Sequence, residues 1–142
     1  MLGWVNYIGH SMETFLNQSE VTHIVTQIHQ AWAKTFHPID PVGMASHYSE
    51  DAILYGSAIA LFSGREGVQK YFEMLPEGLY IGVKFAPAYI VSLTSDVISM
   101  AGSASFFRQG QDPLEVRITQ VFVERNKKWL IASHHVSPKQ VL

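Results

Sequence analysis

The chain has 142 residues, 47% of them hydrophobic and 15% charged, with a net charge of -2 and no cysteine. This length fits one domain; the near-neutral charge without a basic stripe excludes an electrostatic surface for nucleic acid, and the lack of cysteine excludes disulfides and thiolate chemistry. Because no run of 18 apolar residues could span a membrane and residues 1–16 lack a signal-peptide pattern, we expect a cytoplasmic protein with no membrane partner.

The first predicted elements are an arm and a helix. Residues 1–16 have no clean periodicity and are interpreted as an arm on the domain or on a neighbouring subunit, so that residues 17–142 form the single domain. A helix is predicted over 17–36, with Asn17 and Glu20 spaced as in a capping box. Its apolar stripe has helical spacing and consists of Val21, Ile24, Val25, Ile28 and Trp32.

A short second helix is predicted over 41–48, because Asp40 can cap it and Pro41 suits the first helical position. Glu50 and Asp51 follow it and are interpreted as solvated carboxylates at the turn into a strand. The next predicted elements are strands over 52–55 and 58–62 and a helix over 65–74.

The remainder of the chain is predicted to be β-structure, with Gly102 marking a bend. Asn126 and Lys127 form a two-residue hairpin turn. The predicted strands span 80–93, 97–108, 114–124 and 128–137. Helices followed by long antiparallel strands indicate an α+β fold, in which a curved antiparallel sheet wraps around three helices and leaves a cone open at one end.

The second half of the chain resembles the closing hairpin of SnoaL-like proteins, in the nuclear-transport-factor-2-like superfamily. Those hairpins share an Arg-x-Thr-x-Val-aromatic strand, a turn, Trp-x-Ile and a late His-x-Ser. The matching residues here are Arg117, Thr119, Val121, Phe122, Trp129, Ile131, His135 and Ser137. Segments 48–55 and 64–72 are similar to the front half of the same family and to the association domain of calcium/calmodulin-dependent protein kinase type two. The resemblance implies a cystatin-like α+β barrel around a pocket.

The family includes steroid isomerases, and the resemblance argues against their mechanism here. Trp32 falls where those enzymes place the tyrosine of the oxyanion hole, and Gly56 falls where they place the carboxylate base. Neither an indole nor a glycine can perform these roles, since such an isomerase requires both groups.

Arg117 lies within an apolar strand, so we expect its guanidinium to be buried and to need a partner. One interpretation is an anchor for a ligand carboxylate or carbonyl in the pocket. The alternative is an ion pair with an acidic residue on the sheet surface or in a dimer interface, for which Glu115 and Glu124 are candidates.

His134 and His135 are adjacent and therefore point to opposite faces of one strand. If the turn at 126–127 sets the register, Ile118 pairs with His135 and Arg117 shares a face with His134. The family resemblance implies that His135 is the characteristic histidine, and a bulge would reconcile the two placements. The histidine facing the pocket could act as a general acid or base or have a structural role only.

Aromatic side chains could line an apolar cavity, with tyrosine hydroxyls giving directional contacts, or could form ordinary core packing. The candidate binding residues are Trp32, Tyr48, Tyr55, Phe62, Phe107, Arg117, Thr119, His134 and His135, and the candidate catalytic residues are His135 and Arg117. The seven histidines are scattered without a metal-ligand spacing, and there is no glycine-rich phosphate loop, so no metal or cofactor is expected.

Three functions remain open from the sequence. Two of them are pocket domains for a small, largely apolar molecule: an isomerase, cyclase or hydro-lyase acting on a carbonyl compound, and a binding protein without chemistry. The third is a self-association module without catalysis. A cavity of roughly 300 Å³ or more with convergent polar groups would favour the pocket, and a filled interior with an apolar sheet face would favour assembly. The apolar-rich composition and the two apolar faces of the last strands predict a homodimer.

Overall fold

A computed structural model describes residues 15–56 and 60–139. The predicted arm therefore lies almost entirely outside the described residues. Three helices are present in the described part, namely α2 (Gln18–Phe36), α3 (Pro41–Ser46) and α4 (Gly64–Glu73). The strands are β1 (Tyr48–Tyr55), β2 (Phe62–Ser63), β3 (Tyr80–Thr94), β4 (Val97–Arg108), β5 (Gln111–Arg125) and β6 (Lys128–Pro138).

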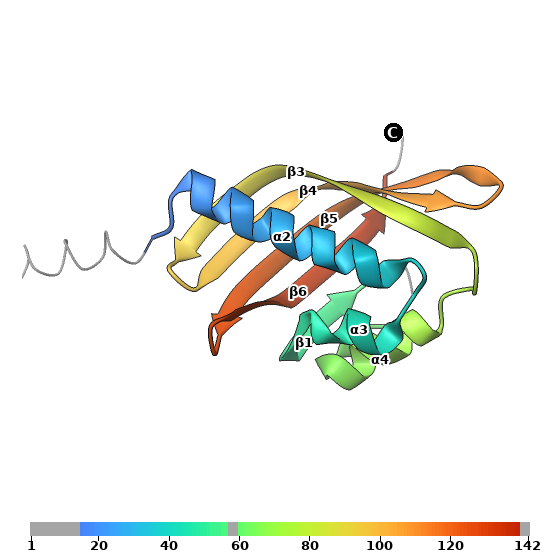
Figure 1. Ribbon diagram of the computed structural model, residues 1–142, viewed down its shortest axis with the longest axis horizontal. Helices are drawn as coiled ribbons and strands as arrows, with labels where there is room; N and C mark the ends of the chain where they lie inside the picture. The colour runs from blue at the N-terminus through green and yellow to red at the C-terminus, as the bar shows by residue number, and fades with distance from the viewer. Residues whose placement is uncertain (1–14, 57–59, 140–142) are drawn as a thin grey trace, which may run out of the picture.

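The strands form one six-stranded sheet in the order β2-β1-β6-β5-β4-β3. Helix α2 crosses one face of this curved sheet, while α3 and α4 lie together beside β1 (Figure 1). All neighbouring strands are antiparallel except β1 and β6, which run parallel. The predicted α+β class is thus confirmed, and the predicted all-antiparallel sheet is corrected at this one pair.

Helix α2 forms as its sequence predicts. The Asn17 side chain accepts a hydrogen bond from the backbone N–H of Glu20, and the Glu20 carboxylate accepts one from that of Asn17. Both contacts satisfy donors that the first helical turn leaves unpaired. The buried stripe of α2, including Val25 and Trp32, packs into the single hydrophobic core.

Strand β1 is longer, and the preceding helix shorter, than predicted. The helix ends at Ser46, and Tyr48 already pairs with Ile131 of β6. Tertiary packing decides this boundary, because Tyr48 is fully buried in the core. The second predicted strand shrinks to Phe62–Ser63, and residues 57–59 lie outside the described part.

Two irregularities shape the long strands. The turn at Asn126 and Lys127 has the two positive φ angles that a tight hairpin requires. Its register holds as far as the pair Phe122–Ile131 and then shifts by one residue, so that Val121 faces Ser133. One extra residue on β6 is the signature of a β-bulge, which turns every later β6 side chain to the opposite face.

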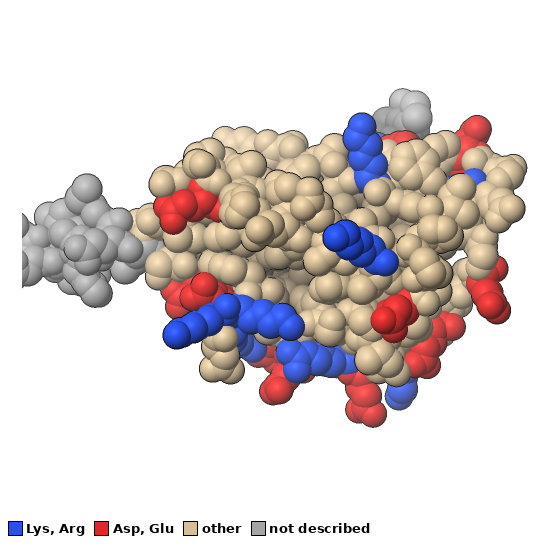
Figure 2. Space-filling view, viewed as in Figure 1, with Lys and Arg blue, Asp and Glu red and all other residues tan. Residues whose placement is uncertain are grey.

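The sheet has an inner face toward α2 and an outer face away from the core. Along β5 the buried positions Val116, Ile118, Gln120 and Phe122 alternate with more exposed ones. Charged side chains gather mainly along the lower edge of the visible surface, near the β5–β6 turn, β1, α3 and α4, whereas the surface over the middle of α2 is tan (Figure 2). None of the helices in the described ranges is long and apolar enough to cross a membrane.

Candidate functional site

A small cavity lies inside the cone, between α2, α4 and the inner face of the sheet. Its volume is about 40 Å³. The residues around it are Trp32, Phe36, Tyr71, Phe72, Leu75, Tyr80, Phe106, Leu114, Val116, His134, Val136 and Pro138. The volume falls well short of the roughly 300 Å³ of a drug-sized ligand site, so this cavity alone does not meet the size expected of a binding pocket, although it exceeds the space that one water requires.

Three buried polar side chains from different elements form a series of hydrogen bonds next to this cavity. The Trp32 Nε1–H of α2 donates to the Tyr48 hydroxyl of β1 at 3.1 Å. The same hydroxyl lies 2.9 Å from His134 Nδ1 on β6. Trp32 and His134 line the cavity, whereas Tyr48 lies behind them.

The donor chemistry favours the tautomer of His134 whose proton is on Nε2. An indole N–H can only donate, so the Tyr48 oxygen accepts from Trp32 and its own proton is free to go to His134 Nδ1. The His134 proton then resides on Nε2. Among the described residues, no side chain or backbone group pairs with this buried Nε2 atom.

Burial also keeps both groups neutral. Desolvation, followed by the charges of His29 and His135, lowers the pKa of His134 to about 3. Desolvation raises the pKa of Tyr48. His134 is therefore a neutral imidazole at pH 7, and its residue lines the cavity.

A second buried polar pair lies next to this series of hydrogen bonds. His29 Nε2 of α2 lies 2.7 Å from Gln120 Oε1 of β5, and the His29 ring stacks on Phe85 with centroids 3.9 Å apart. Burial lowers the pKa of His29. Gln120 is the cross-strand partner of His134, and its Nε2 is likewise buried with no partner in the described part. Sequence reasoning missed Gln120, although it alternates in phase with the buried Ile118 and Phe122.

Arg117 does not reach the cavity. Its side chain is exposed on the outer face of β5, between the buried Val116 and Ile118. Thr119 is two residues further along and is exposed on the same face. The prediction of a buried guanidinium is wrong, because strand alternation places Arg117 in phase with the exposed Glu115.

The bulge on β6 decides between the two histidines. Without it His135 would pair with the inward-facing Ile118, but the shifted register pairs His135 with Thr119 and turns it outward. His135 is exposed and lies 5.8 Å, between ring centroids, from the half-exposed Tyr55. The histidine in the interior is thus His134, and the expectation that His135 or Tyr55 faces the pocket is wrong.

Two further predicted aromatic residues lie away from the cavity. Phe62 is half-buried and packs edge-on against Tyr71 with centroids 5.4 Å apart. Phe107 lies on the outer face with 37% of its surface exposed, whereas its neighbour Phe106 lines the cavity. Of the candidate binding residues, Trp32, Tyr48 and His134 are the ones that the structure brings together in the interior.

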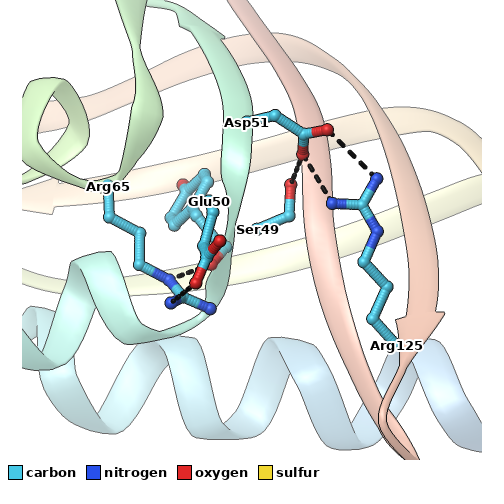
Figure 3. A network of polar contacts seen from close by, with 6 residues as sticks. Ser49, Glu50, Asp51, Arg65 and Arg125 are labelled. Atoms are coloured by element: carbon cyan, nitrogen blue, oxygen red, sulfur yellow. Dashed lines mark hydrogen bonds and ion pairs between the residues drawn. The ribbon is translucent and has the colours of Figure 1, made fainter.

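The carboxylates Glu50 and Asp51 lie on β1 and point in different directions toward two arginines (Figure 3). Asp51 accepts from Arg125 at 2.7 Å and from Ser49 at 2.9 Å, and these contacts lower its pKa to about 2. Glu50 lies 3.6 Å from Arg65. Both are solvent-exposed ion pairs. Within the described ranges, no group of three or more histidines and carboxylates is placed to hold a metal.

The site is suited to hydrogen bonding rather than to proton abstraction. A general base needs a pKa near the working pH, and that of His134 is several units lower. The described contacts of His134 are with Tyr48 and with aromatic rings, not with a carboxylate that would raise its basicity. What the arrangement provides is a fixed N–H donor in an apolar surrounding.

The chain matches known structures over most of its length. A ketosteroid isomerase-like protein from Erwinia carotovora atroseptica has a TM-score of 0.72 at 12% identity, covering 88% of this chain and all of the other. A cystatin-like domain of unknown function from Nostoc punctiforme has a TM-score of 0.73 at 15% identity, with coverages of 89% and 82%.

The similarity with the highest identity among these concerns an assembly domain. A putative calcium/calmodulin-dependent protein kinase II association domain from Xanthomonas campestris is 25% identical, with a TM-score of 0.61 and coverages of 87% and 88%. No curated protein matches the chain significantly. The family model of the SnoaL-like domain matches residues 25–140. The chain therefore belongs to the SnoaL-like family, with its nuclear-transport-factor-2-like, cystatin-like fold.

Proposed function

We propose that the chain binds a small, largely apolar molecule whose hydrogen-bond acceptor meets the Nε2–H of His134. The proposal is supported by the unpartnered, fully buried Nε2 of His134, a residue in the lining of an apolar cavity. An unsatisfied buried donor costs about 1–3 kcal/mol, and an acceptor on a ligand would recover this cost. Trp32 and Tyr48 hold the imidazole in the donating tautomer.

The acceptor is best supplied by a neutral carbonyl group. The N–H is uncharged and the lining is almost wholly apolar, so a carboxylate would lose its hydration without a compensating charge. The cavity of about 40 Å³ admits only a few heavy atoms unless side chains move. Binding without proton transfer is the form of this function that the low basicity of His134 supports.

The test compares cyclopentanone with cyclopentane in thermal-shift titrations of wild type and His134→Leu. We expect cyclopentanone to stabilise the wild type more than cyclopentane does, and the variant to bind the ketone about five- to tenfold more weakly, as the loss of one hydrogen bond implies. His135→Leu, on the outer face, is the matched control and should bind like the wild type. Equal ketone affinity in His134→Leu would contradict the proposal.

A second candidate function is self-association through the outer face of the sheet. Tyr89 is 72% exposed, and Val91 and Leu93 on the same strand are also exposed. Two cross-strand rows on this face are Tyr89–Ala101–Thr119–His135–Tyr55 and Val91–Ser99–Val121–Ser133–Ile53. Such a weakly charged, partly apolar surface favours a protein partner, and the 25% identical association domain supports a second copy as that partner.

A further inference from the structure

A second, larger hollow adjoins the cavity at the open end of the cone. It has a volume of about 280 Å³ and lies between the α2–α3 connection and the α4–β3 connection. Its lining residues are Phe36, His37, Pro38, Ile39, Leu75, Pro76, Glu77, Gly78 and Tyr80. We call it the outer groove, and the cavity beside His134 the inner cavity.

The two spaces are separated by shared side chains. Phe36, Leu75 and Tyr80 line both the inner cavity and the outer groove. The rings of Phe36 and Tyr80 are in contact, with centroids 5.7 Å apart. Leu75 follows the end of α4, is only partly buried and is the one flexible aliphatic side chain of the three. A change of its rotamer is therefore the least costly way to join the two spaces.

The joined space has polar groups near its two ends and an apolar middle. The residue His134 lines the inner cavity, and the side chains between it and the outer groove are apolar or aromatic. At the outer end the proline and isoleucine surfaces of Pro38, Ile39 and Pro76 meet the polar residues His37 and Glu77 at solvent. A ligand matching this order has its acceptor at one end and an apolar body behind it.

We propose that the inner cavity and the outer groove form one elongated site for a straight aliphatic chain with a carbonyl group near one end. The carbonyl oxygen accepts from His134, and the chain passes Leu75 and lies along the outer groove. This inference rests on the proposed binding function and adds the shape and class of the ligand. The two spaces together reach the lower end of the size range of small-molecule sites, which the inner cavity alone does not.

The test measures binding of 2-butanone, 2-hexanone, 2-octanone and 2-decanone to the wild-type chain by titration calorimetry. Each methylene that leaves water for the groove should tighten binding about fourfold, so that affinity rises steeply along the series. Leu75→Trp should block the passage and abolish this gain with chain length. Met74→Trp is the matched control, since Met74 is the exposed neighbour of Leu75, and should keep the full gain.

A second variant guards against misfolding of the first. Ile39 lines the outer groove but not the inner cavity. Ile39→Trp should therefore weaken the binding of 2-decanone and leave the binding of 2-butanone unchanged. If 2-butanone binds through His134 but affinity does not rise with chain length, the elongated site is overturned while the proposed function stands. If none of the ketones binds, both are overturned. Equal losses in Leu75→Trp and Met74→Trp would also refute the role of the passage.

Discussion

At the scale of the residue, the behaviour of His134 follows from the two side chains behind it. An indole can only donate, so the Tyr48 proton is available to His134 Nδ1, and in that arrangement the imidazole carries its own proton on Nε2. Removing Trp32 would free the Tyr48 oxygen from this constraint. The tautomer of a buried histidine is thus decided by a residue that does not touch it through a hydrogen bond.

The buried imidazole predicts a loss of stability in acid. Its pKa is about 3 in the folded chain and about 6.5 when unfolded, so only the unfolded chain takes up this proton as the pH falls between those values. The free energy of unfolding should drop by up to about 1.4 kcal/mol per pH unit in that window, with no such contribution above pH 6.5. Urea denaturation of wild type and His134→Leu from pH 7.5 to 4 measures the difference.

The same experiment has an internal control and a clear contrary result. His135→Leu changes a histidine whose ring reaches solvent in the folded state, so it should retain the steep wild-type dependence. Identical slopes for wild type and His134→Leu would mean that the pKa of His134 is the same in the folded and the unfolded chain. The lowered pKa that burial implies would then be refuted.

Whether a side chain is buried or exposed could be predicted from the sequence where the alternation of side chains along a strand alone decides it. Glu115 and Arg117 share a phase along β5, opposite to Val116 and Ile118, and this simple period already indicates that Arg117 is exposed. The expectation of a buried arginine gave more weight to its apolar neighbours than to that period. The partners of His134 were not predictable in this way, because Tyr48 lies 86 residues away in sequence.

At the scale of the element, local signals predicted the helices and the hairpin turn, and tertiary packing decided the rest. The capping box at Asn17 and the positive φ angles at Asn126 and Lys127 are formed within a few residues. The β-bulge on β6 lies between the cross-strand pairs Val121–Ser133 and Phe122–Ile131. It is not a local signal, because it depends on how β6 fits against both β5 and β1. A single extra residue there exchanged the faces of His134 and His135.

Gly102 gives a prediction at this scale. A Cβ atom on Gly102 would lie 2.5 Å from the Ala86 carbonyl oxygen and 2.8 Å from Pro87 Cα, both backbone atoms of β3. Gly102→Ala should therefore force the two strands apart and cost roughly 1–3 kcal/mol, as overpacking does. Gly82→Ala is the matched control on β3, because its nearest contact would be an ordinary 3.7 Å.

Chemical denaturation of the two variants decides the matter. We expect a clear drop in midpoint for Gly102→Ala and a change within about 0.5 kcal/mol for Gly82→Ala, as for other surface substitutions. Equal stability of both variants would show that β3 and β4 approach each other less closely at Gly102 than the structure indicates.

At the scale of the whole molecule, one sheet separates two apolar regions with different exposure. The inner face is closed by α2 and the core, while the outer face carries the rows that begin at Tyr89 and Val91. Ligand binding and self-association therefore use opposite sides of the same strands. A change on one side reaches the other only through the backbone of β4, β5 and β6.

Self-association predicts a dimer that one charge can disrupt. Tyr89→Lys places an ammonium group on the outer face, and in a two-fold dimer one substitution enters the interface twice. Sedimentation velocity at micromolar concentration should give a dimer for wild type and a monomer for Tyr89→Lys. Val42→Lys is the control, because Val42 is 64% exposed on α3 and away from the sheet. A monomeric wild type would contradict this candidate function.

The parallel pairing of β1 with β6 has a consequence for synthesis on the ribosome. Among the described residues, the only other neighbour of β1 is the two-residue strand β2, so β1 lacks its long partner strand until Lys128–Pro138 has been made. Until then a nascent chain presents two open strand edges, one on β1 and one on β5, to any chain nearby.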